Sequence, residues 1–308
     1  MKTLSIIVPV YYNEDSLSPL MSELLKVEET LKSLNVELEL VFIDDGSGDG
    51  SLQELVRLKA SYPRLSIVKM TRNFGAIQAV KVGMNFINGD CFMFLSADLQ
   101  DSPSLIIEMV RRWLDGSKYV ICVRKNRDDP WVSKMFAALH YKLIRALVIK
   151  DFPEGGYDLA LMDSAMLPYM KQGGKNINIS LFGFWLGYEP DIIYYSRQAR
   201  VHGVSRWTFV KKVKYFFDSV LGFSITPIRL MSIIGLLVSV ISFMYGITVV
   251  LTALIGGQEV PGFSATASLL SFLLGIVIVM LGLIAEYLWR IFDQTSERPE
   301  AVIEKIYK

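Results

Sequence analysis

The sequence is poor in the residues that build disulfide frameworks and transition-metal clusters. It contains two cysteines and two histidines among 308 residues. Cys91 and Cys122 each lie in an apolar run typical of a buried strand, which favours buried thiols over a disulfide or a metal pair. His140 and His202 are too few for a histidine-rich metal site.

The sequence also lacks an excess of charge of either sign. Its net charge is +1, and charged residues make up 20% of the chain, below the quarter or so typical of soluble domains. A charge balance this close to neutral excludes bulk binding of polyanions, so no nucleic-acid partner is expected. A cleavable signal peptide is not expected either, because the apolar run at residues 4–10 is short and leads directly into polar residues.

Two long stretches near the C-terminus contain no charged side chain. They cover residues 230–258 and 260–285, and Arg229, Glu259 and Glu286 bound them. Each stretch is long enough to cross about 30 Å of hydrocarbon. We therefore expect two membrane-spanning helices near residues 230–255 and 265–289. The alternative, a buried helical hairpin in a soluble core, is disfavoured by the uninterrupted apolar length.

The basic residues around these stretches predict an orientation. Lysines and arginines precede the first stretch and follow the second, whereas the connection at residues 256–263 has none. The positive-inside rule then places both termini and the preceding domain in the cytoplasm, in a multi-pass protein of the inner (plasma) membrane. Residues 204–223 mix basic and aromatic side chains, which suits the lipid headgroup layer. A helix at 131–149 has mixed faces and suits either solvent or a membrane surface.

Strand-like and helix-like segments alternate through the first half of the chain. Apolar runs predict strands at residues 4–10, 38–43, 66–70, 91–95 and 119–123, separated by helical patterns at 15–34, 51–61, 74–87 and 103–115. This alternation is typical of an α/β domain with a mostly parallel, doubly wound sheet. A ligand should lie beyond the carboxyl ends of the strands.

Polar clusters follow four of these strands, and we interpret them as one nucleotide site. Asp44-Asp45-Gly46-Ser47 offers carboxylates to a ribose or base, although acidic turns are common. Asp98 and Gln100 offer hard oxygen ligands that could hold Mg²⁺ or Mn²⁺ against a diphosphate. A helix-capping loop is the alternative there, because Ser102-Pro103 is a typical helix start.

Taken together, these motifs resemble glycosyltransferase family 2, and within it the polyprenyl-phosphate glycosyltransferase branch. That branch includes dolichol-phosphate mannose synthases and bacterial undecaprenyl-phosphate glucosyl- and aminoarabinosyltransferases. The resemblance covers nearly the whole chain, including the paired apolar stretches and Glu286-Tyr287-Leu288-x-Arg290 after the second. The motifs that carry it are Pro-Val-Tyr-Tyr-Asn-Glu at 9–14, Asp-Asp-Gly-Ser at 44–47, Arg-Asn-Phe-Gly at 72–75 and Ala-Asp-Leu-Gln-Asp at 97–101.

The resemblance implies a GT-A fold and an inverting, metal-dependent transfer. The sugar would pass from a nucleotide sugar, UDP-glucose or UDP-GlcNAc first, to polyprenyl (undecaprenyl) phosphate. The product would be a lipid-linked monosaccharide for modifying a surface glycan, moved by a separate flippase. The resemblance also implies a homo-oligomer, a tetramer. We expect a catalytic domain at 1–203, interfacial juxtamembrane helices at 204–228, a transmembrane hairpin at 229–290 and a cytosolic tail at 291–308.

The resemblance also assigns roles to individual residues. Asp98 and Gln100 would hold the metal, with Asp98 acting in catalysis and nucleotide binding. Asp158 would orient the acceptor or act as a base, although a phosphate acceptor is already ionised at neutral pH. The nucleotide would contact Pro9, Tyr11, Glu14, Asp44, Asp45 and Arg72, and the acceptor phosphate would contact Arg200, Ser205 and Arg206, with Arg124 and Arg127 as weaker candidates.

Two departures from the branch keep alternatives open. Ser96 stands where the branch has an aspartate, and Ala160 stands where it often has an arginine. These changes could mark a different sugar or a weakened, nucleotide-binding scaffold. A processive polysaccharide synthase is a further alternative, since such enzymes carry Gln-x-x-Arg-Trp. Here Gly203 occupies the glutamine position before Arg206-Trp207, and more membrane helices would be expected.

Overall fold

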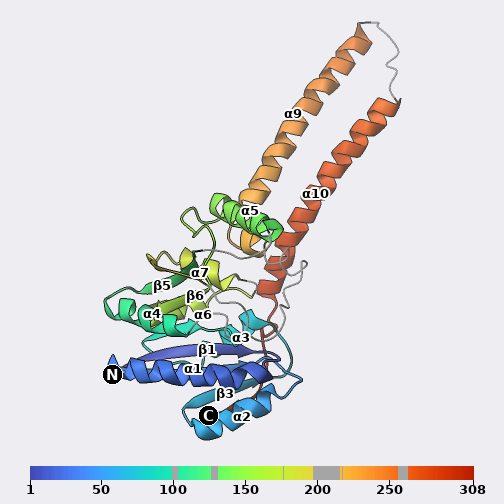
Figure 1. Cartoon of the computed structure of the whole chain (residues 1–308). Helices are drawn as coiled ribbons and strands as arrows, with labels where there is room; N and C mark the ends of the chain where they lie inside the picture. Colours follow the sequence, from blue (N-terminus) through green and yellow to red (C-terminus); the bar gives the residue numbers. More distant parts are fainter. Residues whose placement is uncertain (99–102, 126–130, 176, 197–215, 217, 256–262) are drawn as a thin grey trace. The chain divides into compact units, whose positions relative to one another are not determined.

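The computed structural model describes the chain except for residues 99–102, 126–130, 176, 197–215, 217 and 256–262 (Figure 1). Its described residues form two compact units. The first comprises Met1–Gly222 together with Arg298–Lys308, and the second comprises Phe223–Glu297.

The first unit is built on a mixed, mostly parallel sheet of eight strands in the order β7-β5-β6-β4-β1-β2-β3-β8. Strands β6 and β8 run antiparallel to their neighbours, and the other pairs are parallel. The predicted α/β domain with a mostly parallel sheet is therefore confirmed. The strands are β1 (Lys2–Val10), β2 (Val36–Asp44), β3 (Leu65–Met70), β4 (Cys91–Phe94), β5 (Tyr119–Arg124), β6 (Leu159–Asp163), β7 (Asp191–Tyr195) and β8 (Ile303–Tyr307).

Helices separate the strands much as the sequence predicts. One difference is α3, which begins at Ala76 rather than at residue 74, because Gly75 has a φ of 107° that is incompatible with a right-handed helix. The backbone amides of Phe74 and Gly75 donate to the Asp45 carboxylate. The helices are α1 (Glu14–Ser33), α2 (Ser51–Ser61), α3 (Ala76–Gly83), α4 (Ser104–Leu114), α5 (Trp131–Leu147), α6 (Leu167–Lys171) and α7 (Ile179–Trp185), with a 3₁₀ turn, η1 (Ser164–Met166).

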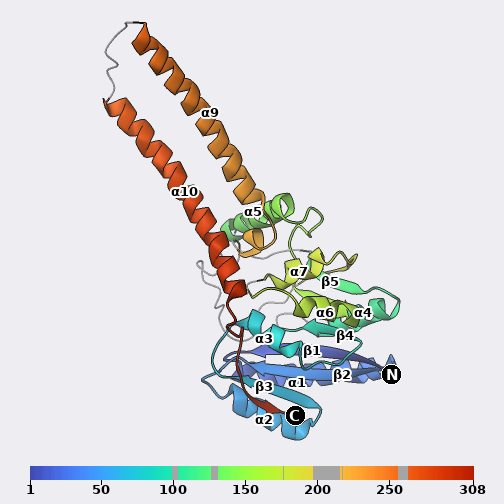
Figure 2. The same cartoon turned by 180° about the vertical axis from the view of Figure 1, so that it is seen from behind.

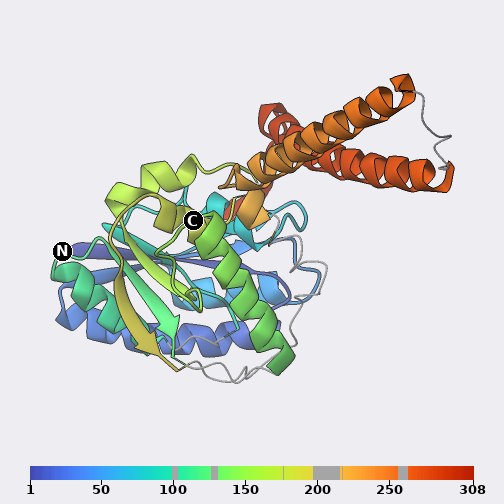
Figure 3. The ribbon, with the colours of Figure 1, turned by 90° about the horizontal axis from the view of Figure 1, so that it is seen from above.

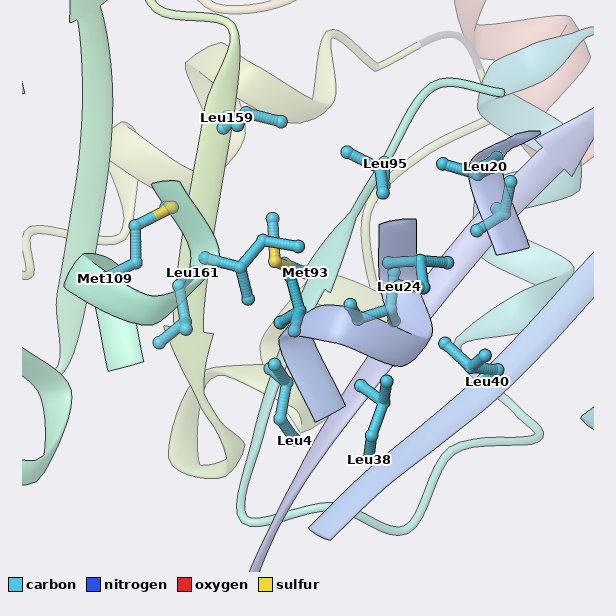
Figure 4. Packing of buried hydrophobic residues seen from close by; sticks show 14 of the residues in the cluster. Leu4, Leu20, Leu24, Leu38, Leu40, Met93, Leu95, Met109, Leu159 and Leu161 are labelled. Carbon is cyan, nitrogen blue, oxygen red and sulfur yellow. The ribbon is translucent and has the colours of Figure 1, made fainter. Parts of the chain in front are cut away.

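The main core lies between the sheet and helices α1 and α4. Leucines of α1, such as Leu24, pack on side chains of β1 and β2, such as Leu4 and Leu40, and all three are fully buried (Figure 4). Met93 and Leu161 continue the same cluster across β4 and β6 (Figure 4). This continuous apolar layer fixes the strand register, so the carboxyl ends of the strands are held in fixed relative positions.

The opposite face of the sheet is covered by α3 and α7 (Figures 2 and 3). A Cβ at Gly83 of α3 would clash with Ile7 of β1, so the absence of a side chain lets α3 approach the sheet closely. On α7, Gly183 lies against the ring of Tyr119, which is fully buried in β5. Cys91 and Cys122 are buried in strands and neither is in a disulfide, as predicted.

The second unit consists of two long helices, α9 (Thr226–Leu254) and α10 (Phe263–Thr295). Thr226–Thr248 and Phe272–Thr295 have mean hydropathies of 2.2 and 2.3, and neither segment is buried in the chain. Both are long and apolar enough to cross a membrane, in agreement with the two expected helices. Near their bases, the Tyr287 hydroxyl donates to the Ser224 carbonyl at 2.9 Å.

The C-terminal residues differ from the sequence interpretation of 291–308 as a tail. Helix α10 continues to Thr295, and Ile303–Tyr307 forms strand β8 at the edge of the sheet, antiparallel to β3. The Thr71 amide also donates to the Val302 carbonyl at 3.0 Å. Strand β8 escapes prediction because its backbone pairs while most of its side chains stay exposed, which leaves no hydrophobic alternation to detect.

Candidate functional site

The candidate site lies at the carboxyl ends of the parallel strands. In the sheet, β1 has β2 on one side and β4 on the other, so the strand order reverses beside β1. Ligands of open α/β sheets bind in the crevice outside such a reversal. The loops after β1, β2, β3 and β4 all leave the sheet at this edge, and they carry the motifs singled out from the sequence.

The loops after β1 and β2 are bonded to each other. Tyr12 adopts a left-handed backbone conformation (φ 56°), and its amide donates to the Ser47 hydroxyl at 3.2 Å. The Asp45 amide donates to the Val10 carbonyl at 2.9 Å. The rings of Tyr11 and Tyr12 meet edge to face, 4.7 Å apart. A non-glycine residue in this conformation costs about 1 kcal/mol, and such strain concentrates at binding sites.

Asp44 is a buried carboxylate, and only one of its two oxygens has a hydrogen-bond partner among the described residues. Its Oδ1 accepts a hydrogen bond from the Ser47 amide at 3.2 Å. Its Oδ2 is buried and has no hydrogen-bond partner among the residues placed in the structure. Burial raises the pKa of the Asp44 carboxyl above its usual value of 3.8. A buried acceptor without a partner is unfavourable, so this oxygen is suited to a donor group on a ligand.

Asp45 contacts the protein backbone with both oxygens. Its Oδ1 accepts from the Phe74 amide at 2.7 Å, and its Oδ2 accepts from the Gly75 amide at 2.9 Å. Burial raises the pKa of the Asp45 carboxyl, against the lowering effect of these hydrogen bonds. At Gly46 (φ +67°), a Cβ would lie 2.5 Å from the Arg72 carbonyl carbon, so only glycine fits between these loops. Asp45 therefore holds the loop after β3 against the loop after β2.

Glu14 is likewise engaged with the protein. Its Oε2 accepts a hydrogen bond from the Gly50 amide at 2.9 Å, just before α2 begins. A Cβ at Gly50 would overlap the Glu14 carboxylate, so the glycine permits the close approach. A carboxylate at this position suits the positive end of the α2 dipole. The predicted contact of Glu14 with the nucleotide stays a prediction.

Asp98 lies in the loop that follows β4, at the last described residue before the gap at 99–102. It is half-buried, and it follows the buried Ala97 and the exposed Ser96. The structure contains no group of three or more histidine, cysteine or acidic side chains that could hold a metal, within the residues it describes. One carboxylate plus substrate phosphates is nevertheless the usual set of protein-bound Mg²⁺ ligands, so Asp98 fits a hard divalent cation held jointly with a diphosphate.

Two other members of the predicted nucleotide site are described by the structure, and several predicted residues lie outside the described part of the chain. Pro9 lies in β1 opposite Ile43. Arg72 is exposed, and its guanidinium lies 4.3 Å from the centre of the Phe74 ring. The remaining predicted residues lie outside the part of the chain that the structure describes: Gln100, Arg127, Arg200, Ser205 and Arg206.

A second polar group lies where β5, β6 and β7 meet. The Arg124 guanidinium donates to both oxygens of Asp158, with Nε–Oδ2 and Nη2–Oδ1 distances of 2.5 Å. The Tyr195 hydroxyl also donates to Asp158 Oδ2, at 2.8 Å. The sequence singled out Arg124 and Asp158 as separate candidates, and the structure pairs them. Tyr195 was not predicted as a site residue, because a tyrosine at the end of a short strand matches no sequence motif.

Comparison with known proteins identifies the family. Residues 5–163 match the model of Glycosyl transferase family 2. An uncharacterized glycosyltransferase of Bacillus subtilis (strain 168), YkcC, is 32% identical over 98% of this chain and 94% of its own. A bactoprenol glucosyl transferase of Shigella phage SfX is 30% identical over 98% of each chain. A solved mannosyltransferase from Pyrobaculum calidifontis is 18% identical, covers 63% of this chain and 56% of its own, and superposes with a TM-score of 0.45.

The fold is that of an α/β enzyme with a GT-A-like, mostly parallel sheet. The chain belongs to glycosyltransferase family 2, and it is a glycosyltransferase. Its likeness to the polyprenyl-phosphate glycosyltransferase branch runs through both the catalytic unit and the apolar helices, because the matched relatives align over nearly the full chain.

Proposed function

We propose that this enzyme transfers a sugar from a nucleotide diphosphate sugar to a polyprenyl phosphate. One observation carries the proposal: the bactoprenol glucosyl transferases align with 98% or more of this chain, so the similarity includes α9 and α10 as well as the catalytic unit. Glucose is accordingly the first sugar to test, with UDP-glucose as donor and UDP-GlcNAc as the next choice. Undecaprenyl phosphate is the corresponding acceptor in a bacterium.

On the donor side, the nucleoside binds at the ends of β1 and β2. The buried Oδ2 of Asp44, which has no partner in the described part of the chain, accepts a hydrogen bond from the base or ribose. Pro9 lies on the neighbouring strand β1, Tyr11 begins the loop after that strand, and Arg72 lies on the loop that Asp45 holds in place. Asp98 and Gln100 hold Mg²⁺ or Mn²⁺ against the diphosphate. Bound there, the cation offsets the charge that develops on the leaving nucleotide.

On the acceptor side, the lipid phosphate binds beside Arg124 and Asp158. Arg200, Ser205 and Arg206 supply further cationic and hydroxyl groups for it. In the reaction, a phosphate oxygen attacks the anomeric carbon and the bond from that carbon to the diphosphate oxygen breaks, which inverts the anomeric centre and releases a nucleoside diphosphate. The phosphate oxygen is already ionised near neutral pH, so Asp158 orients the acceptor rather than removing a proton from it.

Further features of the cell biology belong to the same proposal. Helices α9 and α10 anchor the enzyme in the inner membrane, with the catalytic unit and both termini in the cytoplasm. The lipid acceptor then reaches the site from the same membrane. The lipid-linked sugar crosses the membrane through a separate flippase, because two helices are too few to form a path for its headgroup. Assembly as a homo-oligomer, a tetramer, completes the proposal.

The proposal is tested by a transfer assay on the purified full-length enzyme in detergent. Undecaprenyl phosphate, Mg²⁺ or Mn²⁺, and a panel of labelled sugar nucleotides are supplied, and label entering the organic phase is counted. Label from one donor, lost on chelation of the metal and in Asp98→Ala, supports the proposal. Intact nucleotide binding with no label from any donor, alongside an active relative, contradicts it and favours a nucleotide-binding scaffold.

The same assay decides what Ser96 does. If the site is a weakened form of the branch pattern, Ser96→Asp preserves or raises the rate of transfer, because a carboxylate binds a divalent cation better than a hydroxyl does. A large loss of rate in Ser96→Asp would instead show that the exposed Ser96 belongs to a different donor geometry.

A further inference from the structure

Three polar side chains meet at the carboxyl ends of β5 and β7 and the beginning of β6. Arg124 and Tyr195 are the last residues of the parallel strands β5 and β7, and they are paired in register. Asp158 immediately precedes β6, which runs antiparallel to β5, and its amide donates to the Cys122 carbonyl at 3.1 Å. The Lys125 amide also donates to the Tyr195 carbonyl at 2.9 Å, so the backbone fixes all three positions.

Among the described residues, two donors from different strands share the Asp158 carboxylate. Arg124 approaches it as a fork, and Tyr195 adds a hydroxyl hydrogen bond to the oxygen that Arg124 Nε also contacts. The side chains of Arg124 and Asp158 are each 19% exposed. An ion pair this far from bulk water keeps its geometry only when further hydrogen bonds satisfy its lone pairs. The Tyr195 hydroxyl supplies one of them.

Tyr195 is suited to act as a rigid reference point. The residue is 8% exposed and belongs to the main hydrophobic core, together with Ile193 of the same strand. A tyrosine has only two side-chain torsions, so a ring packed in the core leaves its hydroxyl little freedom. The neighbouring Tyr194 projects from the opposite face of β7 and is 58% exposed.

We propose that Tyr195 is a positioning residue: its hydroxyl, fixed by the core, holds the Asp158 carboxylate and through it the Arg124 guanidinium in the arrangement needed for transfer to the lipid phosphate. This inference rests on the proposed function. Tyr195 acts through Asp158 rather than on the sugar or the phosphate, so its loss affects the reaction step more than donor binding. A misplacement of about 1 Å at such a group is sufficient to lower a rate up to 10²-fold.

The test compares Tyr195→Phe with Tyr194→Phe, which removes the same hydroxyl from the exposed face. Transfer to undecaprenyl phosphate is measured with kcat and KM for donor and acceptor, in the wild-type and Asp158→Asn backgrounds. We expect Tyr195→Phe to lower kcat about 10-fold with the donor KM unchanged, and Tyr194→Phe to match the wild type. In the Asp158→Asn background, Tyr195→Phe should lower kcat no further, because the carboxylate that it positions is gone.

Melting temperatures of the wild type, Tyr195→Phe, Asp158→Asn and the double variant check that the interaction is formed. A smaller loss for the double variant than for the sum of the single variants shows that Tyr195 and Asp158 are coupled. Wild-type kcat in Tyr195→Phe, or equal loss in both backgrounds, would overturn the inference. Failure of the proposed function has a different signature: the wild type and Tyr194→Phe would both transfer nothing to the lipid phosphate.

Discussion

Asp44 and Asp45 are adjacent in the chain and differ in what their carboxylates contact. Asp45 accepts two backbone hydrogen bonds from the loop after β3. Asp44 accepts one from Ser47 and keeps a buried oxygen without a partner among the residues described. Asp44 is therefore assigned to the ligand and Asp45 to the shape of the site.

Substitution of the two aspartates should separate binding from stability. Asp44→Asn should weaken UDP binding about 10- to 100-fold, since a hydrogen bond to a charged group contributes about 1.5–3 kcal/mol. Its free energy of unfolding should hold or rise, because a buried ionised group is removed. Asp45→Ala should lower the free energy of unfolding by about 2 kcal/mol through two lost hydrogen bonds. Calorimetric titration and thermal melts measure the two effects. Equal destabilisation by both variants would contradict the division of roles.

The raised pKa of Asp44 predicts a pH dependence of nucleotide binding. Burial raises the pKa above 3.8 in the free protein, so the carboxyl takes up a proton at a higher pH than an exposed aspartate does. The protonated form is a poorer acceptor, so UDP affinity should fall as the pH is lowered, beginning above 3.8. The free energy of unfolding of the ligand-free protein should change in the opposite direction. Because its pKa is raised in the folded state, ionised Asp44 opposes folding, so this contribution to stability falls as the pH rises.

The measurement is a series of UDP dissociation constants at decreasing pH without added metal, with Asp44→Asn as the control. The wild-type affinity should fall toward low pH, and the dependence should be reduced in Asp44→Asn. An identical pH dependence in the two proteins would mean that another group titrates.

The candidate site residues at the strand ends could be predicted from the sequence. A buried apolar run that stops at an acidic turn marks both the strand and its carboxyl end. The division of roles between Asp44 and Asp45 could not, since both lie in one motif and only the fold shows which oxygen is taken. Tyr195 was out of reach for a similar reason: its hydroxyl matters through a contact with a residue 37 positions earlier.

Among the elements of the fold, strand β8 brings residues 303–307 beside β3, which leads into the candidate site. It pairs with β3, and Val302 accepts a hydrogen bond from Thr71 directly before the loop that Asp45 holds. Lys81 of α3 contacts the Glu300 carboxylate and donates to the Gly173 carbonyl at 2.8 Å. Residues 298–308 therefore contact both β3 and α3, the two elements that flank the loop containing Arg72.

Charge exchange at Lys81 and Glu300 tests the contact with α3. Their side chains are 11% and 30% exposed, so Lys81→Glu should lower the free energy of unfolding by about 3 kcal/mol or more, by leaving like charges in a partly buried site. The double variant Lys81→Glu/Glu300→Lys should recover part of that loss. The pair Lys69 and Glu304 joins β3 to β8 and is more exposed than the first pair, so it serves as the control and should contribute less to the free energy of unfolding. Thermal melts of the full chain in detergent measure each variant, and no recovery in the double variant would contradict the pairing.

The long elements were predictable, and so was the four-residue β4, whose two phenylalanines favour a strand, but the five-residue strands β6, β7 and β8 were not. Strands β1 and β2 each have nine residues, and their apolar runs are long enough to read directly. Strands β6, β7 and β8 have five residues each. Strand β6 is buried, but so short a run does not by itself distinguish a strand from part of a helix, and β7 and β8 lie at the sheet edges. The antiparallel direction of β6 places Asp158 beside the carboxyl ends of β5 and β7, and no local pattern encodes a strand's direction.

At the scale of the whole molecule, a glycosyltransferase family 2 unit and two apolar helices belong to one chain. If α9 crosses the membrane, lysine at its centre should reduce insertion, since a charge there costs about 2.5–3.5 kcal/mol on insertion scales. Leu236 and Leu237 lie within α9 and are 66% and 57% exposed in the chain. Leu236→Lys/Leu237→Lys should therefore shift protein from the membrane fraction to the alkaline wash. Leu25→Lys, on the surface of α1, should not, and equal retention of all variants would argue against a spanning helix.

The central claim concerns which bond is broken and where the sugar goes, and the released nucleotide reports both. Purified enzyme is incubated with undecaprenyl phosphate and the donor that labels the lipid, and the nucleotide products are separated and counted against the lipid-linked sugar. Transfer of the sugar alone to the lipid phosphate predicts UDP in equal amount to labelled lipid, and none above background without the lipid. Release of UMP, or of UDP with the sugar free in water, would contradict the proposed reaction.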